Sequence, residues 1–179
     1  WERRIASDAR NRIPLAMRCL LIEHDSGLEL VDSGLGNKEP DKFRDIYGVE
    51  NDGANGRTAL EDAIAQAGHR IDDVKTVLNS HLHFDHAGGD TFIAPDDPDR
   101  RVQLSFPNAQ YICHRREFDW ATHTNERTHA SYLAHNFVPV AEAGRFRFLD
   151  GLSGEVLPGI NMIVTPGHVF PLVAREGGV

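Results

Sequence analysis

Cysteine is scarce in this sequence of 179 residues, which contains only Cys19 and Cys113. The two lie far apart in apolar stretches, and neither has a second cysteine at the spacing that zinc ligands use. We therefore expect two buried free thiols, because nothing in the sequence supports a disulfide or a cysteine-based metal site.

Long apolar runs and clusters of positive charge are missing as well. No run approaches the roughly 18 apolar residues of a membrane-spanning helix, so no membrane partner is expected. The formal net charge is −8 and there is no basic stripe, which argues against nucleic acid as a partner. A small-molecule substrate is the partner that remains, and the oligomeric state is left open.

The length fits one domain with a substantial core, so we expect a single domain over residues 1–179. Strands come first, helices are interleaved, and strands follow again, which predicts an α/β sandwich of sheets flanked by helices. The chain begins at Trp1 rather than Met, and it stops just after an apolar run. We therefore expect an N-terminal strand and a C-terminal part to be missing, and a cytoplasmic location is favoured.

Strands are predicted at residues 17–23 and 28–34 as a hairpin, then at 74–80, 108–114 and 145–150, with further strand-like stretches up to His168. One helix is predicted from the capping box of Thr58 and Glu61 to Gly68. Shorter helices are predicted at 41–48 and 115–123, a loop at 94–100, and a helix or an ordered loop at 124–137.

Three histidines and an aspartate stand within six positions of the segment NSHLHFDHAGG, residues 79–89. His81 and His83 are two residues apart, so on an extended segment both point the same way and can share one cation. Asp85 and His86 follow after the chain has turned and can face a second point nearby. This spacing favours two adjacent metal positions, and imidazole and carboxylate donors suit zinc.

Two further features bear on these metal positions. Gly88 and Gly89 permit sharp backbone geometry after the ligands. His168 ends the stretch TPGH, which alone would only mark a turn. It gains meaning because the first metal position needs a third ligand.

HLHFDHAGG resembles the HxHxDH signature of the metallo-β-lactamase superfamily. VTPGH at 164–168 is similar to the downstream histidine of that superfamily, and VDSG at 31–34 to its aspartate at the end of an early strand. The sequence of residues 106–133 looks most like that of hydrolases related to N-acyl homoserine lactonases. The resemblance extends from about residue 17 to residue 168 and implies an αββα sandwich with the metals at one edge between the sheets.

The resemblance also implies a role for each site residue. His81, His83 and His168 would hold the first metal, and Asp85 and His86 the second. Asp32 would brace the ligand loop, and the alternative for Asp32 is a turn-capping residue. A histidine at position 83, where di-iron flavoprotein members carry glutamate, favours zinc hydrolysis.

The superfamily normally adds an aspartate that bridges both metals and then a final histidine, both after the TPGH segment. Glu176 is the only acid after His168. We therefore expect two zinc ions in the complete enzyme and one in this chain.

The expected function is zinc-dependent hydrolysis of a small ester or lactone by a metal-activated hydroxide. Asp85 would orient the hydroxide and carry a proton to the leaving group. The alternatives are a glyoxalase II-like thioesterase, a β-lactamase-like hydrolase, and a metal-binding but catalytically silent fragment. Six histidines without ligand spacing are interpreted as surface or loop residues, with the last three near the substrate mouth: His24, His69, His114, His123, His129 and His135.

Overall fold

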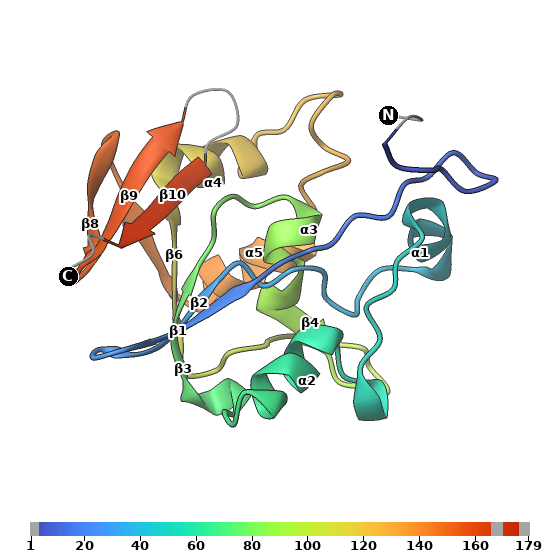
Figure 1. Ribbon diagram of the computed structural model, residues 1–179, viewed down its shortest axis with the longest axis horizontal. Coiled ribbons are helices and arrows are strands. Elements are labelled where there is room, and N and C mark those ends of the chain that lie inside the picture. Colours follow the sequence, from blue (N-terminus) through green and yellow to red (C-terminus); the bar gives the residue numbers. More distant parts are fainter. Residues whose placement is uncertain (1–3, 166–169, 176–179) are drawn as a thin grey trace.

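A five-stranded sheet lies at the centre of the computed structural model, which describes residues 4–165 and 170–175 (Figure 1). Its strands run in the order β1-β2-β3-β6-β7. β1 is antiparallel to β2, and the other neighbours are parallel. The strand bounds are β1 Leu20–His24, β2 Gly27–Val31, β3 Val74–Leu78, β6 Gln110–His114 and β7 Phe146–Leu149. The predicted hairpin is confirmed, with β1 beginning three residues later than expected.

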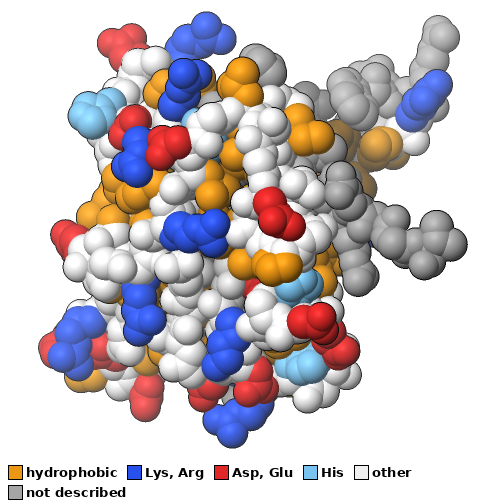
Figure 2. All heavy atoms as spheres, turned by 90° about the vertical axis from the view of Figure 1, so that its left-hand side faces the viewer, with side chains coloured by type: hydrophobic (Ala, Val, Ile, Leu, Met, Phe, Trp, Pro, Cys, Tyr) orange, Lys and Arg blue, Asp and Glu red, His pale blue; other side chains and the backbone are white. Residues whose placement is uncertain are grey.

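A second sheet of three antiparallel strands, in the order β10-β9-β8, lies beside the central sheet, at the left of Figure 1. Its strands are β8 Ser153–Leu157, β9 Ile160–Thr165 and β10 Phe170–Arg175. A two-stranded ribbon is formed by β4 Thr91–Ile93 and β5 Val102–Leu104. The face that carries the second sheet shows side chains of both charges interspersed with hydrophobic ones (Figure 2).

The helices are α1 Asp41–Tyr47, α2 Ala59–Gln66, α3 Phe84–Ala87, α4 Arg115–Thr122 and α5 Ala134–Glu142. Short 3-10 turns occur at Ala54–Gly56, Ile71–Asp73 and Gly88–Asp90. The capping box at the start of α2 is present as predicted, since the Thr58 backbone N–H donates to Glu61 Oε2 and the Glu61 N–H to Thr58 Oγ1. Within the described ranges, no helix is long and apolar enough to cross a membrane.

Adjacent residues of the central strands face two different cores, because successive side chains of a strand alternate. Val77 and Tyr111 belong to a cluster that includes Ile64 of α2. Their neighbours Leu78 and Ile112 pack in another cluster with residues of the second sheet, Val156 and Met162. Strand β3, VKTVL, is buried at every position except Lys75, as expected of a strand that is covered on both faces.

The stretch 124–137, predicted as a helix or an ordered loop, divides between the two. Residues 124–133 form turns and loop, and a helix begins at Ala134 and continues past residue 137 to Glu142. Pro139 lies inside it, and an internal proline argues against a helix at the level of sequence. The three-residue strands of the β4–β5 ribbon and strand β10 were not predicted.

Candidate metal centre

The predicted ligand segment begins at the carboxyl end of β3, the middle strand of the central sheet, and continues into α3. The rings of His81 and His83 lie 4.6 Å apart between centroids, and those of His81 and His86 lie 3.9 Å apart. His81 is buried, while the side chains of Asp85 and His86 are partly exposed. Asp85 Oδ2 lies 3.5 Å from His86 Nε2. The structure therefore brings three predicted imidazoles and the carboxylate of Asp85 into one cluster.

This cluster has the donor chemistry of a zinc site but does not complete one. Among residues 4–165 and 170–175, no group of three or more His, Cys, Asp or Glu side chains is arranged so that it could hold a metal ion. His168, the predicted third ligand of the first position, lies outside the described residues. The residues present fit zinc by type, because neutral imidazole and carboxylate are the donors that zinc takes.

Asp32 holds this segment from the end of β2. Its Oδ1 accepts a hydrogen bond of 2.7 Å from the backbone N–H of Ser80, and its Oδ2 accepts one of 2.8 Å from the Ser80 hydroxyl. Asp32 Oδ2 also lies 2.8 Å from Nδ1 of His86. A carboxylate only accepts, so Nδ1 of His86 carries a hydrogen, and in the neutral ring Nε2 keeps its lone pair for a metal. The backbone of Asp32 is left-handed, with φ 56°, which aspartate tolerates better than most residues.

The charges around His86 favour its protonated form when no metal is bound. Burial lowers the pKa of His86, but the hydrogen bond with Asp32 and the negative charges of Asp32, Asp85 and Glu117 outweigh burial and raise it. The same negative charges favour any cation placed at the ring, so the electrostatics of the site suit a metal ion.

Gly88 and Gly89 serve a different purpose from the one predicted. Neither has a positive φ, and Gly88 is helical with φ −61°. A Cβ on Gly89 would lie 2.2 Å from the carbonyl oxygen of Ser33, and one on Gly88 would lie 2.9 Å from that of Gly34. The two glycines are therefore required because the loop after β2 packs directly against the backbone that follows the ligands.

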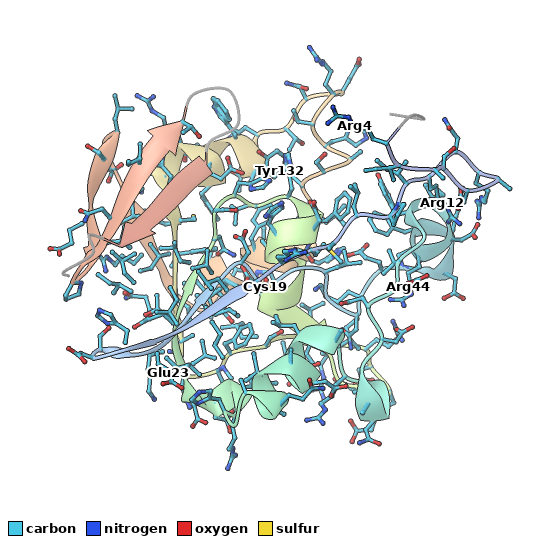
Figure 3. The ribbon with its side chains drawn as sticks, in the orientation of Figure 1. Arg4, Arg12, Cys19, Glu23, Arg44 and Tyr132 are labelled. Atoms are coloured by element: carbon cyan, nitrogen blue, oxygen red, sulfur yellow. The ribbon has the colours of Figure 1, made fainter. Side chains whose placement is uncertain are left out.

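An open cleft of about 1040 Å³ adjoins the cluster. Asp85 and Phe84 of α3 line it together with the N-terminal segment and α1. Arg12 of the N-terminal segment and Arg44 of α1, both labelled in Figure 3, also line the cleft. Both arginines are engaged with the protein: Arg12 with Asp8 and with the Asp45 carbonyl, and Arg44 with Asp52. The cleft places Asp85 at a surface that a small molecule can reach.

The remaining histidines lie away from the ligand cluster in several settings. His123 and His129 are exposed and bond to nearby backbone carbonyls. The expectation of a surface or loop position is wrong for His114, which is buried and caps α4 by accepting from the Arg116 N–H. His135 lies in α5 and pairs with Glu39 at 2.7 Å. Neither His123, His129 nor His135 lines the cleft. Cys19 and Cys113 are both free thiols, as predicted, with Cys19 only partly buried.

Three residues that support the ligands were not predicted: Ser80, which lies within the ligand segment, and Glu117 and Tyr132, which contact it from outside. The position of Glu117 in its helix could have indicated that this residue has a partner. It shares a helix face with Ala121, four residues later, and both are buried. A charged residue on the buried face of a helix is rare without a partner and could have marked Glu117 as important.

Residues 14–95, which include the HxHxDH segment, match the metallo-β-lactamase superfamily. A probable metal-dependent hydrolase from Staphylococcus aureus superposes with a TM-score of 0.78 and 25% identity, over 97% of this chain and 57% of that one. Over residues 14–95 the chain is thus similar to the metallo-β-lactamase superfamily. This likeness and the superposition confirm the predicted fold class of an α/β metallo-β-lactamase-like protein.

The chain also resembles lactonases. An N-acyl homoserine lactonase of Bacillus thuringiensis is 29% identical over 168 residues, which cover 86% of this chain and 55% of the relative. The solved structure of an N-acyl homoserine lactone hydrolase, with the product N-hexanoyl-L-homoserine bound at its catalytic metal centre, matches with 26% identity and a TM-score of 0.58. That match covers 87% of this chain and 55% of the other. The chain thus spans about half the length of the lactonases that it matches.

Proposed function

We propose that this protein is a zinc-dependent hydrolase of small lactones or esters. The observation that carries the proposal is the cluster of His81, His83 and His86 beside a cleft that reaches Asp85. The likeness to N-acyl homoserine lactonases supports a lactone over other substrates. Zinc is the metal that we favour, because the proposed ligands are imidazole and carboxylate groups, which zinc binds.

In this proposal His81, His83 and His168 hold one zinc ion, and Asp85 and His86 contribute to a second position. Bound zinc supplies Lewis acidity, which polarises a substrate carbonyl and brings the pKa of water to about 7. The side chains of the protein would orient the ligands, bind the substrate and transfer the proton.

Asp85 is the candidate for proton transfer. Its side chain is 42% exposed, and it lines the cleft, so a substrate oxygen can approach it. An ionised carboxylate accepts a proton from the attacking water and can return it to the leaving group. Asp32 remains behind His86 and does not face the cleft lining, so its role is to keep the His86 ring in one orientation.

The cleft also has a surface for the acyl part of a substrate. Leu35, Tyr47 and Phe84 are among the side chains that line it, and the rings of Tyr47 and Phe84 lie 5.0 Å apart. Apolar side chains with a few polar groups are typical of small-molecule sites. A lactone with an apolar acyl chain is therefore the preferred substrate in this proposal.

The test compares three substrate classes in parallel on the zinc-loaded protein: an N-acyl homoserine lactone, a glutathione thioester and a β-lactam. We expect the highest kcat/KM for the lactone and loss of turnover when a chelator removes the metal. A kcat/KM for the thioester or the β-lactam above that for the lactone would replace the lactone assignment. Zinc binding without any turnover would favour a catalytically silent metal-binding protein.

A further inference from the structure

The backbone on both sides of His83 is held by a distant part of the chain. The Leu82 N–H, just before His83, donates a hydrogen bond of 2.9 Å to Oε1 of Glu117. The Phe84 N–H, just after it, donates one of 2.9 Å to the carbonyl oxygen of Ser131. Glu117 comes from α4 and Ser131 from the loop between α4 and α5. Two hydrogen bonds from outside the ligand segment therefore fix the peptide units that carry His83.

Tyr132 extends this arrangement to the His83 side chain. Its ring meets the ring of His83 edge to face, with centroids 4.6 Å apart and planes at 69°. Figure 3 shows Tyr132 in the loop that passes close to the ligand segment and α3. The side chain of Tyr132 also forms a hydrogen bond with the side chain of Glu117. Glu117 thus contacts both the backbone before His83 and the ring beside it.

The negative charge of Glu117 needs a physical reason. Its side chain is only 1% exposed, and a buried carboxylate is costly unless it is compensated. A glutamine at this position could accept from the same Leu82 N–H, so the hydrogen bond by itself does not require a carboxylate. The carboxylate of Glu117 lies close enough to the ligand cluster for its charge to act on the ring of His86. A buried anion behind the ligands would favour a cation in front of them.

We infer that Glu117 is a positioning residue, which orients His83 through Leu82 and Tyr132 and strengthens zinc binding through its charge. The inference rests on the proposed zinc site and adds to it a group that does not itself bind metal. Groups that hold metal ligands in place are typically worth about 10–100-fold in metal affinity. Asp32 has the corresponding role for His86, so the two carboxylates would support different ligands of the same cluster.

The test uses two variants at position 117 and one at Tyr132, with a matched control. Glu117→Gln keeps an acceptor for the Leu82 N–H and removes the charge. Glu117→Ala removes both, and Tyr132→Phe removes only the hydroxyl. Asp119→Asn is the control, because it makes the same carboxylate-to-amide change on the exposed side of the same helix. Zinc affinity is measured by competition with a chromophoric chelator, and amide hydrogen exchange at Leu82 is measured in the zinc-free protein.

We expect Glu117→Gln to weaken zinc binding by about 10–100-fold while leaving protection of the Leu82 amide in place. Glu117→Ala should also speed exchange at Leu82. Tyr132→Phe should weaken zinc binding by a smaller factor, and Asp119→Asn should match the parent. If Glu117→Ala fails to fold, the Gln and Phe variants decide the matter, since a purely structural Glu117 would change the unfolding midpoint and not the zinc affinity of the folded protein.

The inference is overturned if Glu117→Gln and Tyr132→Phe both bind zinc as the parent does. It is also overturned if the Leu82 amide of the parent exchanges without protection. Neither result touches lactone hydrolysis by the parent, so the hydrolase assignment would stand. Conversely, a parent that binds zinc but hydrolyses no lactone ends the lactone proposal and leaves the role of Glu117 to be judged on zinc affinity alone.

Discussion

Replacing Asp32 by asparagine tests how the fold prepares His86. Asparagine has the shape of aspartate, but it carries no charge and one of its two terminal atoms is a donor. Its oxygen can still accept from the Ser80 N–H. Its NH₂ group would then face Nδ1 of His86, where Asp32 Oδ2 accepts at 2.8 Å. The ring would have to move its hydrogen to Nε2, and Nε2 would no longer be available to a metal.

The magnitude follows from the contacts that change. The carboxylate of Asp32 accepts three close contacts, from the Ser80 N–H, the Ser80 hydroxyl and His86 Nδ1. Hydrogen bonds to charged groups contribute about 1.5–3 kcal/mol each, and asparagine keeps part of the set. We expect Asp32→Asn to lower the free energy of unfolding of the zinc-free protein by about 1–3 kcal/mol.

The pH dependence of this loss has a definite sign. The pKa of His86 is raised above its ordinary 6.5 in the folded protein, with Asp32 as the main favourable partner. The stabilisation is therefore complete below the ordinary pKa and disappears as the pH rises through the folded value. Asp32→Asn should cost more at about pH 6 than at about pH 9, and the pKa of His86 should fall.

The assay is urea denaturation of the parent and of Asp32→Asn across this pH range, with the His86 pKa followed by NMR. Asp25→Asn is a suitable control, because Asp25 is exposed in the turn between β1 and β2. An equal loss of stability at both pH values, or an unchanged pKa of His86, would refute the role given to Asp32.

Other predictions follow from the site and the fold. Asp85→Asn should reduce lactone turnover by about 10²–10⁴-fold, because the group that transfers the proton is lost. The firmly held zinc should be retained, because its histidine ligands are unchanged. If the variant turns over lactone at the parent rate in steady-state assays, Asp85 has only a structural role. Burial raises the pKa of Asp90 to about 7, so the zinc-free protein should lose stability as the pH rises from about 4 to about 7. Asp90→Asn should remove that slope in denaturation curves, and a slope that persists would assign it to another group. Thr58→Ala should lower the free energy of unfolding by about 1 kcal/mol through loss of the α2 cap, and a change in zinc affinity would contradict a purely local effect.

Local patterns account for the parts of the fold that the sequence predicted. The capping box at Thr58, the apolar residues of β3 and the hairpin of β1 and β2 each lie within a few residues of chain. The three-residue strands of the β4–β5 ribbon are too short for a periodic pattern, and Pro139 hides the second half of α5.

The site shows the same division between near and distant residues. His81, His83, Asp85 and His86 could be predicted because they fall within one short segment. Glu117 and Tyr132 reach that segment from 35 and 49 positions away respectively, counted from Leu82 to Glu117 and from His83 to Tyr132. No spacing rule connects single residues over such distances, so only the folded chain brings them together. The close backbone approach at Gly89 likewise depends on a loop that is distant in sequence.

The zinc content of three proteins tests the central claim most directly. The parent, His83→Ala and His123→Ala are dialysed and analysed for zinc by elemental analysis. His83 belongs to the ring cluster, whereas His123 is an exposed residue that bonds to the Asp119 carbonyl. We predict about one firmly held zinc in the parent and in His123→Ala, and almost none in His83→Ala. Zinc retained by His83→Ala, or lost from His123→Ala, would contradict the assignment of the metal centre.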